Sequence, residues 1–345
     1  MYYSYHGFLF KGVNSVSEYT KNEAMDWAWE NITGQWSTLV TPFTEYNEID
    51  EAGLRSNIQH IRLLGTTGIG CAWGMGEFWA LSIEERKTIY QIVAEEKKPG
   101  WYIAAHVSHS SVKDMVSLAN YAEGLGFDLL VVAPPYFVTK SEQQVVDWVK
   151  ILASNTSLAI MFYNSPQFGI VMSPEGLKDI CNIDNVVGVK EASFNRDITI
   201  ETHRTIGEHA IISAPDEWVL FEGKKLGFQQ KVMFANTSDW RFDNQKDNYY
   251  VQFIDRATKG DVDAHLYESH IQPLKSLSDT WWQRIMKKQN GSLPVPMIKY
   301  WGELMGMKGG PIRPPLYDLS DSEKQELSDD IKLVREKIRS NLGGE

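Results

Sequence analysis

The chain has 345 residues, a formal net charge of -11 and a pI near 5.3, and this acidic balance argues against nucleic acids and anionic membranes as partners, since both bind basic surfaces. Hydrophobic residues make up 43% and charged residues 23% of the sequence, which is typical of a globular protein with a large core. No apolar run approaches the ~18 residues of a membrane-spanning helix, and the N-terminus lacks the pattern of a secretion signal, so we expect a cytoplasmic protein.

Residues 1–33 precede the first strand candidate and form an N-terminal extension with a helix-like pattern over 18–30. Short apolar runs then recur along the chain, as expected of buried parallel strands. The two cysteines, Cys71 and Cys181, occupy apolar positions without a C-x-x-C pattern, so we expect reduced core residues and no metal site. The eight strand candidates cover residues 34–40, 68–73, 101–107, 129–133, 158–163, 186–190, 210–213 and 231–235.

Helix signals stand between these runs. Apolar residues over 54–64 share one face, and Gly65 follows them as a stop signal. Ser82 and Ser141 are each followed three residues later by Glu or Gln, which is the pattern of a capping box. Ser173 precedes a proline, which is favoured at the first position of a helix.

Eight strand candidates that alternate with helices predict a (β/α)8 TIM barrel over residues 34–257. A doubly wound sheet is the alternative, but its usual G-x-G-x-x-G turn is absent after the first strand candidate. Residues 258–345 predict a C-terminal helical segment outside the barrel, with one helix over 296–307 and a proline-rich connector over 309–316. A further capping box at Ser320 predicts the start of a last helix.

Chemistry in such a barrel takes place at the C-terminal ends of the strands, and Lys190 ends the apolar run 186–190. Burial favours the neutral form of a lysine, and a neutral amine is the nucleophile that forms a Schiff base with a carbonyl group. The ordinary alternative is a lysine that pairs with a carboxylate or extends toward solvent. Tyr163 ends the preceding strand candidate, where a phenol can carry protons during imine formation.

Motifs at these strand ends and beyond them resemble those of one enzyme family. From about Trp36 to Leu316 the chain is similar to the dihydrodipicolinate synthase / N-acetylneuraminate lyase family, the class I aldolases that act through a Schiff base. The motifs are Gly74-x-Gly76-Glu77 with Leu81-Ser82-x-Glu84-Glu85-Arg86, Tyr163-Asn164-x-Pro166 with Ser173-Pro174-Glu175, Val189-Lys190-Glu191-Ala192, and Arg313-Pro314-Pro315-Leu316.

This resemblance implies that Lys190 forms an imine with a 2-oxo acid, typically pyruvate, and that Tyr163 relays protons. It also implies that the glycine turn, Gly74, Met75 and Gly76, offers backbone amides to the carboxylate of the 2-oxo acid. No metal or organic cofactor is expected, and the resemblance implies a homotetramer.

Other residues are expected at the substrate by position or by the same resemblance. Tyr136 matches a family tyrosine that reaches an active site, including that of a neighbouring subunit. His106 ends a strand candidate, and we expect a core histidine there rather than a catalytic base. The residues expected to complete the substrate site are Trp79, Tyr136, Asn164, Trp218 and Asn236.

The departures from the family pattern concern the substrate. Gly74-Met75 replaces the usual Ser/Thr or Thr-Thr, and Gln167-Phe168-Gly169 stands where synthases of the lysine pathway carry an arginine. A sugar acid needs hydrogen-bonding partners, since each polar group left unpaired costs roughly 1–3 kcal/mol. The sequence therefore predicts an apolar or aromatic aldehyde product, as in the hydratase-aldolases that cleave arylidene pyruvates. The residues that replace polar groups are Met75, Phe78, Trp79, Phe168 and Trp218.

Three alternatives remain open at this point. Gly74-x-Gly76-Glu77-Phe78 is also similar to the turn of the deoxyglucarate dehydratases, which favours a dehydratase or aldolase of 2-keto-3-deoxy sugar acids. A condensing enzyme like dihydrodipicolinate synthase is a further possibility, less favoured because the arginine is missing. The third is a regulator that binds a 2-oxo acid without catalysis, since a fold does not determine function.

Overall fold

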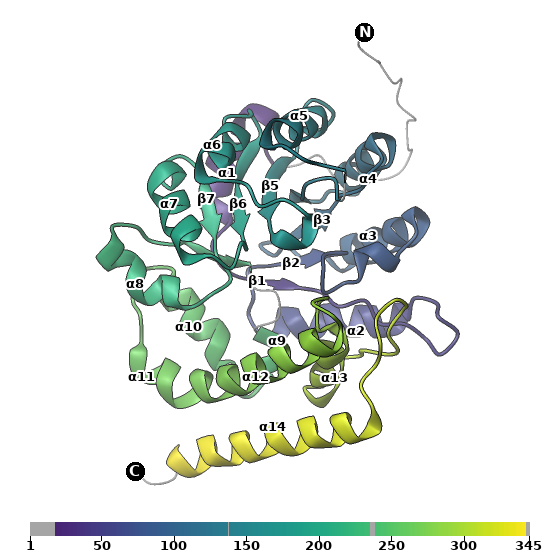
Figure 1. Ribbon diagram of the computed structural model, residues 1–345, viewed down its shortest axis with the longest axis vertical. Coiled ribbons are helices and arrows are strands. Elements are labelled where there is room, and N and C mark those ends of the chain that lie inside the picture. The colour runs from purple at the N-terminus through teal and green to yellow at the C-terminus, as the bar shows by residue number, and fades with distance from the viewer. Residues whose placement is uncertain (1–17, 137, 235–238, 343–345) are drawn as a thin grey trace.

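The computed structural model describes residues 18–136, 138–234 and 239–342, and its centre is a barrel of eight parallel strands surrounded by helices (Figure 1). The predicted TIM barrel is confirmed. The strands are β1 Gly34–Thr38, β2 Gly68–Cys71, β3 Tyr102–His106, β4 Leu129–Val132, β5 Ala159–Asn164, β6 Val186–Glu191, β7 Ile211–Ser213 and β8 Val232–Phe234.

The helices between the strands begin at the predicted signals. The side chain of Ser82 accepts a hydrogen bond from the amide of Glu85, and that of Ser141 accepts one from the amide of Gln144. The side-chain oxygens of Glu85 and Gln144 in turn accept from the backbone amides of Ser82 and Ser141. Gly65 has a φ of 91° just after α2, a conformation that favours glycine. These helices are α2 Glu51–Leu63, α3 Ile83–Glu96, α4 Val112–Gly124, α5 Glu142–Ala153, α6 Pro174–Cys181, α7 Arg196–Ile206, α8 Trp218–Leu226, α9 Asp239–Phe242 and α10 Tyr249–Ala257.

The barrel is almost closed, with the strand order β7-β6-β5-β4-β3-β2-β1-β8. Across the described residues, β7 and β8 are not paired by a strand ladder, and side chains join them instead. The amide of Phe234 donates to Ser213 Oγ at 2.7 Å. The side-chain oxygen of Gln230 accepts from the amide of Ala214 at 2.6 Å, and its nitrogen donates to the Ala214 carbonyl at 3.1 Å. These bonds satisfy backbone groups that the missing ladder leaves unpaired.

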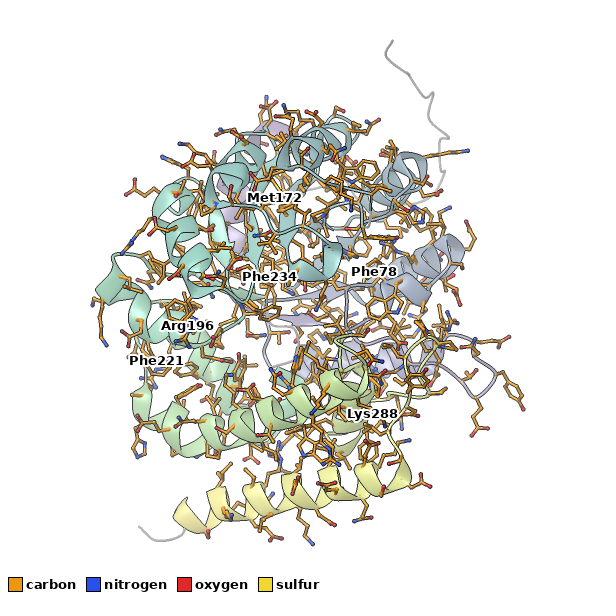
Figure 2. All side chains as sticks on the ribbon, in the orientation of Figure 1. Phe78, Met172, Arg196, Phe221, Phe234 and Lys288 are labelled. Atoms are coloured by element: carbon orange, nitrogen blue, oxygen red, sulfur yellow. The ribbon has the colours of Figure 1, made fainter. Side chains whose placement is uncertain are left out.

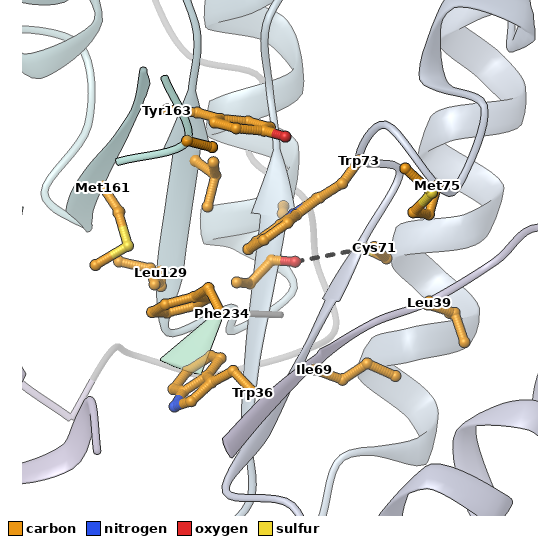
Figure 3. Close-up of a cluster of buried hydrophobic side chains, with 14 of the residues drawn as sticks. Trp36, Leu39, Ile69, Cys71, Trp73, Met75, Leu129, Met161, Tyr163 and Phe234 are labelled. Carbon is orange, nitrogen blue, oxygen red and sulfur yellow. Dashed lines mark hydrogen bonds between the residues drawn. The ribbon is translucent and has the colours of Figure 1, made fainter. Parts of the chain in front are cut away.

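A column of four aromatic rings fills the barrel interior (Figure 3). The ring centroids of Trp36 and Phe234 lie 5.0 Å apart, those of Phe234 and Trp73 lie 5.7 Å apart, and those of Trp73 and Tyr163 lie 6.5 Å apart. All four side chains are buried. The column runs toward the C-terminal ends of the strands, where Tyr163 lies at the top.

Two glycines of β2 make room for the indole rings of this column. A Cβ atom at Gly68 would lie 2.7 Å from Cε3 of Trp36, and one at Gly70 would lie 2.4 Å from Cε2 of Trp73. Both distances are shorter than atoms in van der Waals contact allow. The glycines of this strand and the tryptophans therefore form one packing arrangement.

The described part of the N-terminal extension, residues 18–33, covers the end of the barrel at which the strands begin. It contains a short 3-10 helix, Lys21–Glu23, and α1, Ala24–Asn31. The Tyr19 hydroxyl donates to the Asp128 carbonyl at 2.6 Å and accepts from the amide of Ala159 at 2.7 Å, both at the N-terminal ends of strands. The other end of the barrel, where the strands terminate, is formed by the loops that follow the strands, and active sites of such barrels lie at this end.

The C-terminal segment is helical, as predicted, and packs beside the barrel (Figure 1). The helix expected over 296–307 ends earlier, at Leu304, because Gly306 follows with a φ of 99° and turns the chain. No helix in the described part of the chain is long and apolar enough to span a membrane. The elements are α11 Ala264–Leu266, the π-helix η4 Tyr267–Ile271, α12 Gln272–Lys288, α13 Val295–Leu304 and α14 Asp321–Leu342.

Candidate active site

Lys190 and Tyr163 lie side by side at the C-terminal ends of β6 and β5. The two residues are partners in the register of these parallel strands, so their side chains emerge on the same face, toward the barrel interior. The Lys190 Nζ lies 4.3 Å from the ring centroid of Tyr163 and 4.9 Å from that of Trp73. The amine and the phenol that the sequence predicted as a pair are thus adjacent.

Burial favours the neutral form of Lys190. The side chain is 1% exposed. Removing the ammonium group from water lowers the pKa of Lys190 from 10.5 to about 7. Near neutral pH a large share of this lysine is therefore the uncharged amine, the form that can attack a carbonyl carbon.

The Tyr163 phenol is buried among aromatic rings, with Lys190 on its ring and the Ser165 side chain as a further polar neighbour. Burial raises the pKa of Tyr163 above its ordinary value, and a hydrogen bond with the Ser165 side chain opposes part of this shift. The Phe168 ring packs edge-on against the phenol ring, with centroids 5.2 Å apart. The phenol is thus neutral at physiological pH and has a hydroxyl neighbour. Ser165 was not predicted as a site residue from the sequence, although its position two residues after Tyr163 could have indicated it.

Asn164 faces away from the candidate substrate, contrary to the predicted contact. Side chains alternate along a strand, so the residue after Tyr163 points outward. Its side-chain oxygen accepts from the amide of Met172 at 2.8 Å, and its nitrogen donates to the Met172 carbonyl at 3.2 Å and to Glu191 Oε1 at 3.5 Å. We therefore assign Asn164 to holding the loop after β5 rather than to binding substrate.

The glycine turn follows β2 and is partly held by its own hydrogen bonds. The amide of Gly76 donates to the Trp73 carbonyl at 3.0 Å, and the amide of Glu77 donates to the Gly74 carbonyl at 3.1 Å. Within residues 18–136, 138–234 and 239–342, the amides of Gly74 and Met75 donate no hydrogen bond. The structure thus leaves two of the three expected amides available to an anion, because the third, on Gly76, closes the turn.

A buried ion pair connects this turn to the C-terminal segment. Glu77 Oε1 lies 2.8 Å from the Nζ of Lys299 in α13, and these side chains are 0% and 2% exposed. The same lysine donates to the Pro311 carbonyl at 2.8 Å, and Glu77 Oε2 accepts from the amide of Arg313 at 3.2 Å. The buried pairing of Lys299 was not predicted from the sequence, although a lysine inside the apolar run 295–301 is unusual enough to suggest a buried partner.

Arg313 forms a second connection to the helix that follows the turn. Its guanidinium makes a bidentate pair with Glu85, at 2.6 and 3.0 Å, and donates to the Ala80 carbonyl at 2.9 Å. Three motifs that lie far apart in the sequence, those around Glu77, Glu85 and Arg313, thus meet in one network. The network holds the glycine turn in place after β2, at the C-terminal end of the barrel.

The comparisons with known proteins agree with these motifs. The sequence matches the dihydrodipicolinate synthetase family over residues 31–334. The chain belongs to this family. A 4-hydroxy-tetrahydrodipicolinate synthase of Desulforudis audaxviator is 26% identical over 294 residues, which cover 84% of this chain and 94% of the relative. An uncharacterised DapA-like lyase of Thermococcus onnurineus is 30% identical over 307 residues, which cover 86% and 97%.

Solved structures share the fold. A prophage protein of the dihydrodipicolinic acid synthase family from E. coli K12, solved in complex with pyruvate, matches with a TM-score of 0.75 at 21% identity, covering 88% of this chain and 98% of that one. The family predicted from the motifs is confirmed. Membership in the dihydrodipicolinate synthetase family supports an enzyme of the class I, Schiff-base type.

Of the remaining predicted substrate residues, the structure describes Trp79, Tyr136 and Trp218, which follow β2, β4 and β7 at the mouth of the barrel. Trp79 is 37% exposed and stands at the rim, against the edge of Phe78. Tyr136 is half-buried, with its ring centroid 6.0 Å from that of Phe78. Trp218 is half-buried, and the Arg196 guanidinium lies 4.8 Å from its ring centroid. Asn236 lies outside the described residues. The labelled side chains of Figure 2 place Phe78 and Arg196 on opposite sides of the barrel.

His106 is a core residue, as expected from its position at the end of β3. Nδ1 lies 3.0 Å from the Ala72 carbonyl, and Nε2 lies 2.9 Å from Ser108 Oγ, so both ring nitrogens are engaged. Burial and the neighbouring Arg86 hold the pKa of His106 well below 6.5. A neutral imidazole with two partners shapes the barrel interior and is poorly placed to move protons.

Proposed function

We propose that this protein is a lyase that forms a Schiff base with a 2-oxo acid and releases pyruvate and an apolar or aromatic aldehyde. The observation that carries the proposal is Lys190, a buried amine of lowered pKa, held beside the Tyr163 phenol at the C-terminal end of the barrel. A binder of 2-oxo acids needs no such amine, so the pair favours catalysis over a regulatory role.

In the proposed reaction the neutral amine of Lys190 attacks the C2 carbonyl, and an N–C bond forms. The carbonyl oxygen takes up two protons and leaves as water, which produces a positively charged imine. The bond between C3 and C4 then breaks, and its electron pair moves into the imine to give an enamine. The hydroxyl proton on C4 passes to a base, the aldehyde leaves, and protonation and hydrolysis of the enamine return pyruvate and the lysine. For an arylidene pyruvate, water first adds across the double bond.

Tyr163 and Ser165 supply the protons in this proposal, and no metal or organic cofactor takes part. The phenol lies against the reacting nitrogen, within reach of the carbonyl oxygen during imine formation. The Ser165 side chain lowers the pKa of the phenol, and its hydroxyl takes the place of the one that the family's Ser/Thr residue supplies. The relay thus comes from the loop after β5 instead of the glycine turn.

The carboxylate of the 2-oxo acid binds the turn at Gly74 and Met75. Their two unengaged amides act as an anion-binding nest, and the buried pair of Glu77 and Lys299 holds the turn in place. The net charge of -11 makes such a local site of backbone donors useful, because it attracts an anion without relying on the overall field.

Aromatic side chains around the mouth support an apolar aldehyde product. Phe78 lies 6.1 Å from Phe168 and 6.0 Å from Tyr136, measured between ring centroids, and Met75 in the preceding turn is 2% exposed. Such surfaces bind an aryl group by contact and leave sugar hydroxyls without partners. Gln167 favours the second candidate, a 2-keto-3-deoxy sugar acid, since its side-chain oxygen lies 4.0 Å from a Cβ placed on Gly74.

The proposal includes a homotetramer, as the family resemblance implies, and a cytoplasmic location, as expected from the sequence pattern of the N-terminus. Tyr136 stands half-buried at the rim, where a neighbouring subunit can extend its environment. Size-exclusion chromatography with light scattering measures the assembly directly. A monomer at micromolar concentration would remove this part of the proposal without affecting the chemistry at Lys190.

The test is reductive trapping with pyruvate and borohydride, followed by mass spectrometry of peptides from wild type and Lys190→Met. We expect one adduct on wild type, located on Lys190, and none on the variant. Lys299, which is also buried, serves as an internal control and should stay unmodified. Absence of an adduct on wild type would refute the Schiff-base mechanism and favour a regulator.

The substrate class is tested on the same preparations by measuring aldehyde release. An arylidene pyruvate should yield an aromatic aldehyde and pyruvate with wild type only. If instead only a 2-keto-3-deoxy sugar acid is turned over, the mechanism stands and the aromatic assignment is wrong. If neither is cleaved but pyruvate condenses with an added semialdehyde, the enzyme is a synthase.

A further inference from the structure

The Lys190 nitrogen lies between two aromatic faces. Its Nζ is 4.3 Å from the ring centroid of Tyr163 and 4.9 Å from that of Trp73, and all three side chains are at most 3% exposed. Tyr163 already has a role in the proposed function. Trp73, which lies directly below Tyr163 in the aromatic column of Figure 3, has none so far.

The fold holds the Trp73 indole in this place from two sides. Gly70 lies behind it, since a Cβ there would come within 2.4 Å of Cε2 and 2.5 Å of Cζ2. Phe234 stacks on it with centroids 5.7 Å apart and an interplanar angle of 24°. The backbone turns sharply at Ala72, with a φ of 54°, just before the tryptophan. The indole is therefore held across the barrel beneath the reacting nitrogen.

An indole face attracts positive charge because the π electrons give it a negative potential, and the attraction strengthens where water is excluded. In the proposed reaction the nitrogen of Lys190 is neutral when it attacks and positively charged once the imine has formed. Burial alone disfavours that charge. A buried aromatic face in contact with the nitrogen offsets part of this penalty at the step where the charge appears.

We propose that Trp73 is a catalytic residue that stabilises the positively charged imine on Lys190 through its indole face, together with the ring of Tyr163. The inference rests on the proposed Schiff-base chemistry and extends it. The inference also gives a reason for a tryptophan directly before the glycine turn: only a large ring at this position reaches from Phe234 to the amine of Lys190.

The competing explanation is that Trp73 only fills the core, and Trp36 offers a matched control for it. Trp36 belongs to the same column, is 0% exposed, and packs against the other side of Phe234. Among the described residues the indole nitrogens of both tryptophans are buried without a hydrogen-bond partner, so the two differ mainly in their distance from the lysine. In the same part of the chain no cation lies over the Trp36 ring.

The experiment measures the adduct trapped by borohydride at subsaturating pyruvate, over a range of pH, for Trp73→Phe, Trp73→Leu and Trp36→Leu. We expect the amount of adduct to decrease from wild type to Trp73→Phe and further to Trp73→Leu. The total decrease should be roughly thirtyfold, the size expected for the interaction of a desolvated cation with an aromatic face. Trp36→Leu should stay within about twofold of wild type, because its ring stabilises no charge.

The pH profile separates charge stabilisation from loss of packing. Removing the indole face disfavours the ammonium form of Lys190 as well as the charged imine. In the plot of adduct against pH, the acid limb should therefore move to lower pH while the amount of adduct decreases. A pocket that only loosens admits water, which favours the ammonium and moves the limb to higher pH. A shift to higher pH, or equal losses in Trp73→Leu and Trp36→Leu, would overturn the proposal.

Gly70→Ala keeps the tryptophan but displaces its ring. This variant tests the same proposal if Trp73→Leu does not fold. A methyl group at this position meets only the indole among its nearest neighbours, so the ring must move. The adduct should decrease and the acid limb should shift as in Trp73→Phe. Full trapping in a folded Gly70→Ala would contradict the role of the indole. Failure of wild type to form any adduct refutes the proposed function instead, so the two results are distinguishable.

Discussion

Replacing Lys190 with methionine should abolish the adduct and stabilise the fold. The methionine side chain fills a similar volume and removes a charge that burial disfavours. In the folded protein the pKa of Lys190 is lowered from 10.5 to about 7, so between these values the unfolded chain binds more protons than the folded one. The stability of the wild type therefore rises with pH over this range, and the lysine destabilises the fold most at and below pH 7.

The expected size follows from the two pKa values. One pKa unit corresponds to about 1.4 kcal/mol, so ionisation of Lys190 destabilises the fold by about 4 kcal/mol at pH 7 and about 2 kcal/mol at pH 9. The stability difference between Lys190→Met and wild type should thus shrink by about 2 kcal/mol from pH 7 to pH 9. Packing differences between lysine and methionine add an amount that does not vary with pH.

Urea unfolding of both proteins at equal concentration, at pH 7 and pH 9, measures this difference. Every other titrating group is common to the two proteins and cancels. A stability difference that is the same at both pH values would refute the lowered pKa, and with it the argument that Lys190 is a ready nucleophile. A variant less stable than wild type at pH 7 would show that the lysine has a stronger partner than its burial implies.

Further predictions concern the site and its support. The rate of adduct formation by Lys190 should rise about tenfold per pH unit up to pH 7 and then level off, because only the free amine attacks; a flat profile from pH 5 to 9 would contradict this. Tyr163→Phe should still form the adduct but release aldehyde roughly 10²- to 10⁴-fold more slowly, and an unchanged turnover number would remove the phenol from the relay. Ser165→Ala should slow release by a smaller factor, measured in the same assay, and a loss as large as that of Tyr163→Phe would mean a different role. Lys299→Met leaves Glu77 buried without this partner, so urea unfolding should show that the free energy of unfolding decreases by about 3–5 kcal/mol. Adding Glu77→Gln should recover most of this stability. A decrease below about 1 kcal/mol would mean that the pair does not hold the turn.

The sequence by itself determined the barrel and the placement of a lysine and a tyrosine at the ends of two neighbouring strands. Apolar runs of strand length, capping boxes at Ser82 and Ser141, and stops such as Gly65 act within a few residues, so their outcome depends little on the rest of the chain. The same holds for Lys190 at the end of an apolar strand, where burial and strand polarity together indicate a reactive amine. The alternation of side chains along β5 also implied that Asn164 faces away from Tyr163, a signal that the motif alone did not convey.

Only the tertiary structure decided which distant residues support that pair. The pairing of Glu77 with Lys299 joins positions 222 apart, and that of Glu85 with Arg313 joins positions 228 apart, so neither leaves a periodic trace in the sequence. The indole of Trp73 reaches the Lys190 nitrogen because Gly70 yields space and Phe234 supports the ring from below. Such contacts depend on how closed strands bring side chains together in a densely packed interior, and this is settled only when the whole barrel forms.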